Sequence, residues 1–194
     1  MNQYDYSPDV IEQLNRELRG ALPSGTVIKA PLAADFGGVD YTFTASYRVP
    51  VAVRCRFDRP YNAQDKDVTF RSTEPAMIAA GTYAPLDFFA WFQNHRLIAG
   101  RIVDIYRMAA RVRPPLSERN VTGNGDGTGF IVVRMGELVD ADALLRIGDP
   151  QGGWATACTG GMRRIEQILA TWKAPPSADL ERMRKDERRQ SLST

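Results

Sequence analysis

The segment from Val39 to Phe57 limits the fold more than any other, because two stretches in it alternate apolar with polar residues. A period of two places successive side chains on opposite faces of a β-strand. The residues that share the apolar face are Val39, Tyr41 and Phe43 in the first stretch and Val51, Val53, Cys55 and Phe57 in the second. The opposite face carries acids and two arginines, Arg54 and Arg56. The pattern predicts an antiparallel hairpin with Val51, Val53 and Cys55 buried.

The segments around this hairpin predict further helices and strands. A helix begins at Ser7 and Pro8, an N-cap and a first-turn proline, and we expect its apolar side to pack on the hairpin. Thr26–Ala30 and Asp67–Arg71 alternate as short strands, and Arg71 is expected on an outward face beside the hairpin. The other elements expected are a helical turn at 74–80, a strand or helix at 86–92, a strand at 97–100 leading into a strand or helix near 104, a strand at 130–134, a short helix at 140–146 and an amphipathic helix at 161–172.

Length and composition favour one domain. The chain has 194 residues, 43% of them hydrophobic, which is enough for one well-buried core and short for two. After residue 173 the composition changes to interspersed acids and arginines. We therefore predict a single α/β (α+β) domain over 1–173, with a central mixed β-sheet flanked by helices, and a charged C-terminal tail over 174–194.

The charge pattern is unusual in its choice of cation. The formal net charge is only +2, so no overall field favours nucleic acid. Lysine occurs only at positions 29, 66, 173 and 185, so nearly all of the positive charge is arginine. The planar guanidinium suits carboxylate and phosphate recognition, although a GC-rich genome produces the same excess without selection for function.

The sequence predicts neither membrane insertion nor export. The N-terminus lacks a charged start followed by an apolar run, and no stretch approaches the roughly 18 apolar residues of a membrane span. Cys55 and Cys158 are far apart in sequence and form no metal-ligand spacing, which favours a reducing compartment. We expect a soluble, cytoplasmic protein.

The order helix, strand, loop, strand with Asp40, strand, and then further helices and strands resembles the PD-(D/E)XK nuclease superfamily over residues 7 to 134. In that superfamily an Asp on the second strand precedes an acid-x-Lys triplet on the third. Asp40 matches the first position, so the resemblance implies a restriction-endonuclease-like fold with Asp40 as a catalytic residue. At the triplet this chain has Arg54-Cys55-Arg56 instead.

This replacement changes the chemistry that the resemblance implies. Phosphodiester hydrolysis in the superfamily needs clustered carboxylates to hold Mg²⁺, and a guanidinium repels a dication and donates where an acceptor is required. The sequence therefore predicts no metal site and no cofactor. The arginines beside Asp40 leave three alternatives: a structural ion pair with that carboxylate, a phosphate-contacting surface, and a remnant of a catalytic site.

Three functions correspond to these alternatives. In the first, which we favour, the fold binds a nucleic-acid backbone without catalysis, through an arginine face of Arg54, Arg56 and Arg71. Strand parity puts the first two of these about 7 Å apart on one face. In the second, the chain is a divergent Mg²⁺-dependent nuclease with migrated carboxylates, in which Asp40 is joined by Asp35, Glu12 or Glu17. In the third, the arginine face binds an acidic protein or a second copy of the chain.

Other motifs carry less weight. His95 is the only histidine and has no nucleophile motif beside it. Asn124–Gly129 looks like the start of a calcium loop, but Met135 stands at the position where a bidentate Glu is needed. Neither a phosphate-binding loop nor a dinucleotide fingerprint occurs in the sequence, which argues against nucleotide enzymes of those classes.

Overall fold

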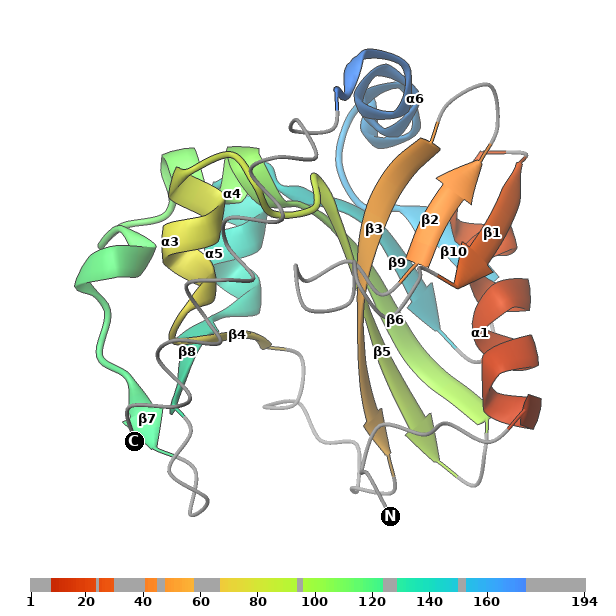
Figure 1. The fold of residues 1–194 in the computed structure, drawn as a ribbon, viewed down its shortest axis with the longest axis horizontal. Coiled ribbons are helices and arrows are strands. Elements are labelled where there is room, and N and C mark those ends of the chain that lie inside the picture. The colour runs from red at the N-terminus through yellow and green to blue at the C-terminus, as the bar shows by residue number, and fades with distance from the viewer. Residues whose placement is uncertain are drawn as a thin grey trace, which may run out of the picture.

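A seven-stranded mixed β-sheet forms the centre of the protein (Figure 1). The computed structural model describes residues 8–23, 25–29, 41–44, 48–57, 67–93, 96–123, 129–149 and 153–173. In spatial order the strands of this sheet are β1 (Thr26–Lys29), β2 (Tyr41–Thr44), β3 (Arg48–Phe57), β5 (Leu86–Gln93), β6 (Arg96–Asp104), β9 (Leu144–Asp149) and β10 (Gly153–Thr156). β3 and β5 run parallel, and the other neighbouring pairs are antiparallel.

β2 and β3 form the hairpin that the alternating segment predicts, with Tyr41 opposite Val51. Val51 and Val53 are buried, with 1% and 5% of their surface exposed. Cys55 is half-buried and packs against the same core. The hairpin is therefore confirmed, and Cys55 is less buried than expected. Asp40 lies outside the described residues.

Two helices pack on the face of the sheet that carries the hairpin valines. They are α1 (Pro8–Ala21) and α6 (Gly161–Thr171), both predicted from their periodicity. Their buried residues in the shared core are Leu14, Leu18, Ile165 and Leu169. The two buried residues of each helix are four positions apart in sequence, which places them on the same side of that helix. The expected packing of the first helix is confirmed.

The opposite face of the sheet is covered by a second layer, on the left in Figure 1. Its strands are, in spatial order, β4 (Val68–Arg71), β8 (Gly129–Val133) and β7 (Thr122–Gly123). Its helices are α3 (Glu74–Ala79), α4 (Ile105–Arg111), the 3-10 helix η2 (Leu116–Glu118) and α5 (Met135–Asp140). In β3, β5, β6 and β9 both faces of the central sheet are thus buried within one α/β domain, so the face of β3 that the sequence marks as polar is covered at Ala52 and Arg54.

The position of β4 corrects the prediction for Arg71. Val68–Arg71 is a strand, as expected, but it pairs with β8 in the smaller sheet and not with the hairpin. Alternation along a strand gives its two faces, whereas its neighbours depend on residues distant in sequence. Arg71 is exposed on this smaller sheet.

The helix predicted at 140–146 is wrong. α5 ends at Asp140, and Asp142 at φ 53° turns the chain through the left-handed region. The residues that follow form β9, whose consecutive leucines, Leu144 and Leu145, are both buried because the strand lies between the two cores. A strand covered on both faces does not alternate, so periodicity fails there. β10 was not predicted, and the ambiguous segment 86–92 is a strand.

The last described residues follow α6. The segment 174–194, predicted as a charged tail, lies outside the described residues. Among the helices of the described ranges, none has the length and apolar character needed to cross a membrane.

Candidate functional site

Arg54, the first arginine of the predicted face, lies between two carboxylates. Its Nε donates to Asp87 Oδ2 at 3.1 Å, and its NH2 contacts Glu74 Oε1 at 2.6 Å. The exposed fractions of the three side chains are 20% for Arg54, 6% for Glu74 and 0% for Asp87. Arg54 is therefore part of a largely internal ion pair with acids from β5 and α3.

Tyr83 and two aromatic rings complete the surroundings of this guanidinium. Arg54 NH2 donates to the Tyr83 hydroxyl at 2.5 Å, and that hydroxyl donates to Asp87 Oδ2 at 3.0 Å. The guanidinium carbon lies 5.3 Å from the centre of the Phe70 ring and 5.7 Å from that of Phe89, within reach of a cation–π interaction. We refer to one set of residues as the buried cluster: Arg54, Glu74, Tyr83 and Asp87.

The fold brings these residues together through the parallel pair of strands. Ala52 on β3 pairs with Asp87 on β5, and Arg54, two residues further, faces the same side of the sheet. Glu74 begins α3, and its Oε2 accepts a hydrogen bond from the Arg71 backbone N–H at 2.6 Å. The buried cluster thus joins the central sheet to the second layer.

Burial raises the pKa of Asp87 to about 6, with the Arg54 guanidinium opposing the rise and the Glu74 carboxylate adding to it. Burial also raises the pKa of Tyr83 well above its ordinary range, helped by the charge of Asp87. Asp87 Oδ1 is buried and has no hydrogen-bond partner in the described part of the chain. The ionised form of Asp87 is therefore costly inside the protein.

The buried cluster is a poor place for a phosphate group. One guanidinium faces two carboxylates, so an approaching anion meets net repulsion whenever both acids are ionised. A metal ion is disfavoured by the guanidinium itself. Within the described ranges, no three His, Cys, Asp or Glu side chains are grouped so that they could hold a metal ion. The chemistry of the cluster is that of an internal structural ion pair.

Several predicted site residues lie where the structure gives no side-chain account. Asp40, Asp35 and His95 are outside the described residues, as is the side chain of Arg56. The residues of the calcium-like loop, 124–128, are also outside them. The predicted pairing of Arg54 with Asp40 therefore stays a prediction, beside the observed pairing with Asp87 and Glu74.

Glu12 and Glu17, the first-helix acids expected to join Asp40 in the nuclease alternative, do not lie beside Arg54. Glu12 is exposed on α1, and Glu17 Oε2 accepts a hydrogen bond from Trp154 Nε1 at 3.2 Å. α1 packs in the core on the hairpin-valine side of the sheet, whereas Arg54 contacts Phe70 and Phe89 of the other core. The central sheet separates these acids from the buried cluster.

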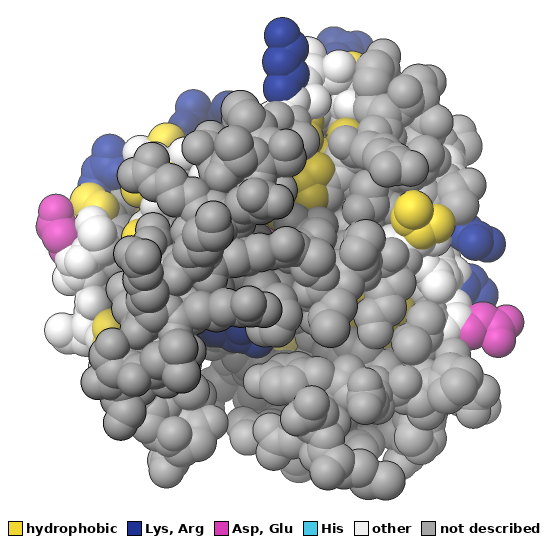
Figure 2. Space-filling model, viewed as in Figure 1, with side chains coloured by type: hydrophobic (Ala, Val, Ile, Leu, Met, Phe, Trp, Pro, Cys, Tyr) yellow, Lys and Arg dark blue, Asp and Glu magenta, His cyan; other side chains and the backbone are white. Residues whose placement is uncertain are grey.

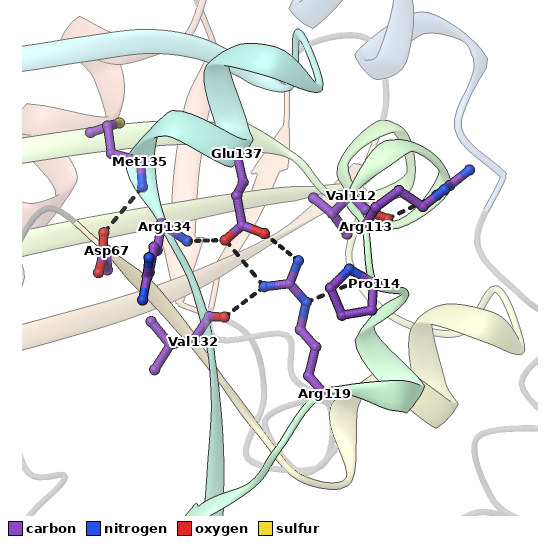
Figure 3. Close-up of polar contacts among 9 residues, drawn as sticks. All are labelled: Asp67, Val112, Arg113, Pro114, Arg119, Val132, Arg134, Met135 and Glu137. Atoms are coloured by element: carbon purple, nitrogen blue, oxygen red, sulfur yellow. Dashed lines mark hydrogen bonds and ion pairs between the residues drawn. The ribbon is translucent and has the colours of Figure 1, made fainter.

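Arg119 is a second internal arginine, and Figure 3 shows its partners. Its NH2 and NH1 bind Glu137 Oε1 and Oε2 at 2.5 and 3.2 Å. NH1 also donates to the Val132 carbonyl at 2.9 Å, and Nε donates to the Pro114 carbonyl at 3.1 Å. The hydrogen bonds from Arg119 to the Glu137 carboxylate lower the pKa of Glu137. Arg119 therefore ties the segment around η2 to β8 and α5, which is a structural role.

Three further arginines converge on one turn nearer the surface. Arg107 NH2 and Arg164 NH2 both bind Asp142 Oδ2, at 2.5 and 2.7 Å. Arg111 NH1 donates to the Ala141 carbonyl at 3.4 Å, and Arg164 NH1 donates to the Asp142 carbonyl. Arg107 and Arg111 are one turn apart on α4, and Arg164 comes from α6. We refer to Arg107, Arg111 and Arg164 as the arginine cluster.

Positive charge exceeds negative charge in the arginine cluster, and solvent reaches it. The side chains of Arg107 and Asp142 are 31% and 36% exposed, that of Arg164 is 18% exposed, and Arg111 is exposed. Hydrogen bonds from Arg164 lower the pKa of Asp142, so this carboxylate is ionised at neutral pH. The other acid nearby, Asp104, is buried and caps α4 by accepting from the Arg107 backbone N–H at 3.0 Å.

Sequence reasoning did not single out the arginine cluster. The spacing of Arg107 and Arg111 is a usable signal once a helix is assigned there, but the sequence near 104 fits a strand as well as a helix. Arg164 joins them through the turn at Asp142, which falls inside the segment wrongly predicted as a helix. The cluster therefore depends on tertiary structure that periodicity does not give.

The chain matches no protein-family model, no curated protein and no solved structure in the three comparisons made. The resemblance to the nuclease superfamily therefore stays a prediction from the sequence.

Proposed function

We propose that this protein binds the phosphate backbone of a nucleic acid through the arginine cluster and does not cleave it. The observation that carries the proposal is the convergence of three guanidinium groups on Ala141 and Asp142. Two carbonyl groups and one carboxylate orient these guanidiniums, and the carboxylate neutralises only part of their charge. Guanidinium groups held in this way can give paired hydrogen bonds to phosphate oxygens.

Other exposed cations extend this surface. Arg113 follows α4 and is exposed, and Arg163 is exposed beside Arg164 on α6. Lys and Arg side chains follow the upper rim of the view in Figure 2, from the region of α4 to that of α6. A nucleic acid carries regularly repeated phosphates, so a spread of cations suits it better than a single small anion does.

Arg54 supports the fold in this proposal and does not touch the ligand. Its Nε and NH2 are engaged by Asp87, Glu74 and Tyr83. Arg56 and Arg71, the other arginines of the face predicted from the sequence, are kept as additional contacts to be tested in the same experiment.

Anisotropy titrations of a labelled single strand and a labelled duplex, at several salt concentrations, test the proposal. Arg107→Gln, Arg111→Gln and Arg164→Gln should each weaken binding to any sequence and lower the slope of log affinity against log salt by about one unit. A thermal melt verifies that each variant is folded. Unchanged slopes in all three folded variants would contradict the proposal.

The first helix offers matched controls. Arg16 and Arg19 are exposed on α1, which lies on the right of the view in Figure 1, away from α4 on the left. Arg16→Gln and Arg19→Gln should leave the salt slope unchanged. Arg56→Gln and Arg71→Gln form the remaining arm. A loss of about one unit in Arg56→Gln would add the hairpin to the contact surface, and the same loss in Arg71→Gln would add the smaller sheet.

The lack of cleavage is proposed from the arginines that stand at the acid-x-Lys positions. The order α1, β1, β2, β3 agrees with the nuclease resemblance and supports a restriction-endonuclease-like fold. Incubation with plasmid, linear and single-stranded DNA in Mg²⁺ or Mn²⁺ should leave each substrate intact. Metal-dependent cleavage that Asp40→Asn abolishes would overturn this part and favour a divergent nuclease.

A further inference from the structure

We infer, on the basis of the proposed function, that the ligand of the arginine cluster is single-stranded nucleic acid, with an unpaired base stacked on the aromatic pair of Tyr106 and Trp172. Tyr106 lies on α4 and Trp172 directly follows α6, the two helices that carry the arginines. The aromatic pair supplies what phosphate contacts cannot, a face that distinguishes an unpaired base from a bare backbone.

Tyr106 and Trp172 pack against each other between α4 and the end of α6. Their ring centres are 5.6 Å apart and their planes are inclined by 29°, which is a stacked arrangement. The Tyr106 hydroxyl donates to the Tyr83 carbonyl at 2.6 Å and fixes its ring. Both side chains are half-buried, so each still presents surface to solvent. A fixed aromatic pair of which part is reached by solvent is suited to stacking by a base.

The aromatic pair and the arginine cluster are close enough for one short ligand. Tyr106 directly precedes Arg107 on α4, and α6 leads from Arg164 to Trp172. At about 1.5 Å per residue, these two positions are about 12 Å apart along the helix. Lys173 is exposed directly after Trp172 and adds a cation at the aromatic end. A strand of a few nucleotides can therefore place phosphates on the arginines and a base on the rings.

Paired bases cannot use such a site. In a duplex each base is stacked on its neighbours, and the protein meets phosphates and groove edges. In a single strand the ring faces are available, and cations combined with aromatic side chains are the usual means of binding it without sequence preference. The combination at α4 and α6 thus favours the single strand.

Three labelled probes separate stacking from charge. They are an oligothymidylate of roughly 12 nucleotides, an abasic deoxyribose-phosphate oligomer of the same length, and a blunt duplex. The oligothymidylate should bind about 5- to 150-fold more tightly than the abasic oligomer, because stacking of one base is gained. Equal affinity for these two would overturn the inference and leave the proposed function intact. Tighter binding of the duplex than of the oligothymidylate would also overturn it.

Variants of Trp172 locate the effect. Trp172→Leu should lose this same factor for the oligothymidylate and leave the affinity for the abasic oligomer unchanged, whereas Trp172→Phe keeps a ring and should retain most of the affinity. Arg164→Gln is the matched comparison, since it should weaken both probes alike. If Trp172→Leu also weakens both probes alike, the side chain only packs the fold and the inference fails.

Tryptophan fluorescence gives a readout that survives if Trp172→Leu fails to fold. Trp91 is 4% exposed, and Trp154 packs against Gly100 and Gly148. Quenching by the oligothymidylate should therefore come from Trp172 and disappear in Trp172→Phe. Quenching that persists in this variant would overturn the inference. If no probe binds, the proposed function itself fails. Equal binding of the oligothymidylate and the abasic oligomer overturns only the inference about stacking.

Discussion

The two arginine-containing clusters of this protein use the same side chain in opposite ways. In the buried cluster one guanidinium meets two carboxylates, Glu74 and Asp87, which are 6% and 0% exposed. In the arginine cluster three guanidiniums converge on a turn with one carboxylate, Asp142, which is 36% exposed. The buried cluster is internal and has no excess of positive charge. The arginine cluster has such an excess and is exposed to solvent.

The ratio of cations to acids and the degree of burial, not the residue type, distinguish the two roles. Removing one partner of a buried pair leaves an uncompensated charge, at a cost of several kcal/mol. An exposed ion pair contributes at most about 1 kcal/mol, because water and salt screen it. The same change, from arginine to a neutral side chain, should therefore act on stability in the buried cluster and on binding in the arginine cluster.

The largest effect is expected for Arg54→Met. This change leaves Asp87 and Glu74 buried without their cation, and we expect the free energy of unfolding to fall by about 3–5 kcal/mol, from a total of about 5–15 kcal/mol. Urea denaturation measures it. Arg16→Met, at an exposed position on α1, is the control and should change stability by less than about 0.5 kcal/mol.

The double variant Arg54→Met with Asp87→Leu sharpens this prediction. It removes both charges of the Arg54–Asp87 pair and should recover part of the lost stability, because a buried ion pair contributes little over apolar side chains of similar volume, while Glu74 still lacks its cation. If Arg54→Met is as stable as the wild type, the arginine of the buried cluster does not contribute to stability as this comparison requires.

The next effect is a pH dependence of stability that comes from Asp87. Burial raises the pKa of this carboxyl from an ordinary 3.8 to about 6. The folded protein therefore binds the proton more tightly than the unfolded chain, and the added stability is fully present below the unfolded pKa and is lost as the pH rises to about 6. Relative to Asp87→Asn, the wild type should lose about 3 kcal/mol of unfolding free energy across this window. If the wild type instead gains stability relative to Asp87→Asn as the pH rises, the raised pKa is not that of Asp87.

The sequence predicted the strands of the hairpin and the two helices on its apolar side, because each has a clear period and one buried face. It missed what lies on the other side. Arg54 reads as a polar, outward residue, although a second layer covers it and Asp87 pairs with it there. No pattern within a strand shows that its polar face is covered by segments distant in the sequence.

The candidate site was predictable only in kind. An excess of arginine pointed to anions, and that expectation carries over to the proposal. The cluster itself needs Arg107 and Arg164 to meet at Asp142, a turn residue with a positive φ that separates α5 from β9. An Asp in the sequence does not by itself indicate such a turn, since non-glycine residues adopt a positive φ only occasionally.

A smaller effect on stability is expected for Arg119→Lys, which tests geometry at constant charge. The guanidinium fork binds Glu137 through two nitrogens and also reaches Val132 and Pro114 (Figure 3). Lysine keeps the charge and cannot reproduce these four contacts, so we expect a loss of about 1–3 kcal/mol in urea denaturation. Arg111→Lys, in the exposed arginine cluster, is the control and should lose less than about 0.5 kcal/mol. Equal losses in the two variants would remove the distinction between internal and surface arginines.

The smallest effect on stability, and the one of opposite sign on binding, is expected for Asp142→Asn. Asparagine tolerates the left-handed backbone found at this residue, φ 53°, and the carbonyls of Ala141 and residue 142 remain to hold Arg111 and Arg164. Stability should change by less than about 1 kcal/mol, because the ion pairs are partly exposed. Affinity for the oligothymidylate should rise about fivefold at low salt, since one negative charge near 4 Å in water contributes about 1 kcal/mol, and this gain should shrink as salt is added. Anisotropy titrations at two salt concentrations measure it. If affinity falls instead, Asp142 matters more for orienting the guanidiniums than for opposing the ligand, and the arginine cluster then resembles the buried one in depending on its acid.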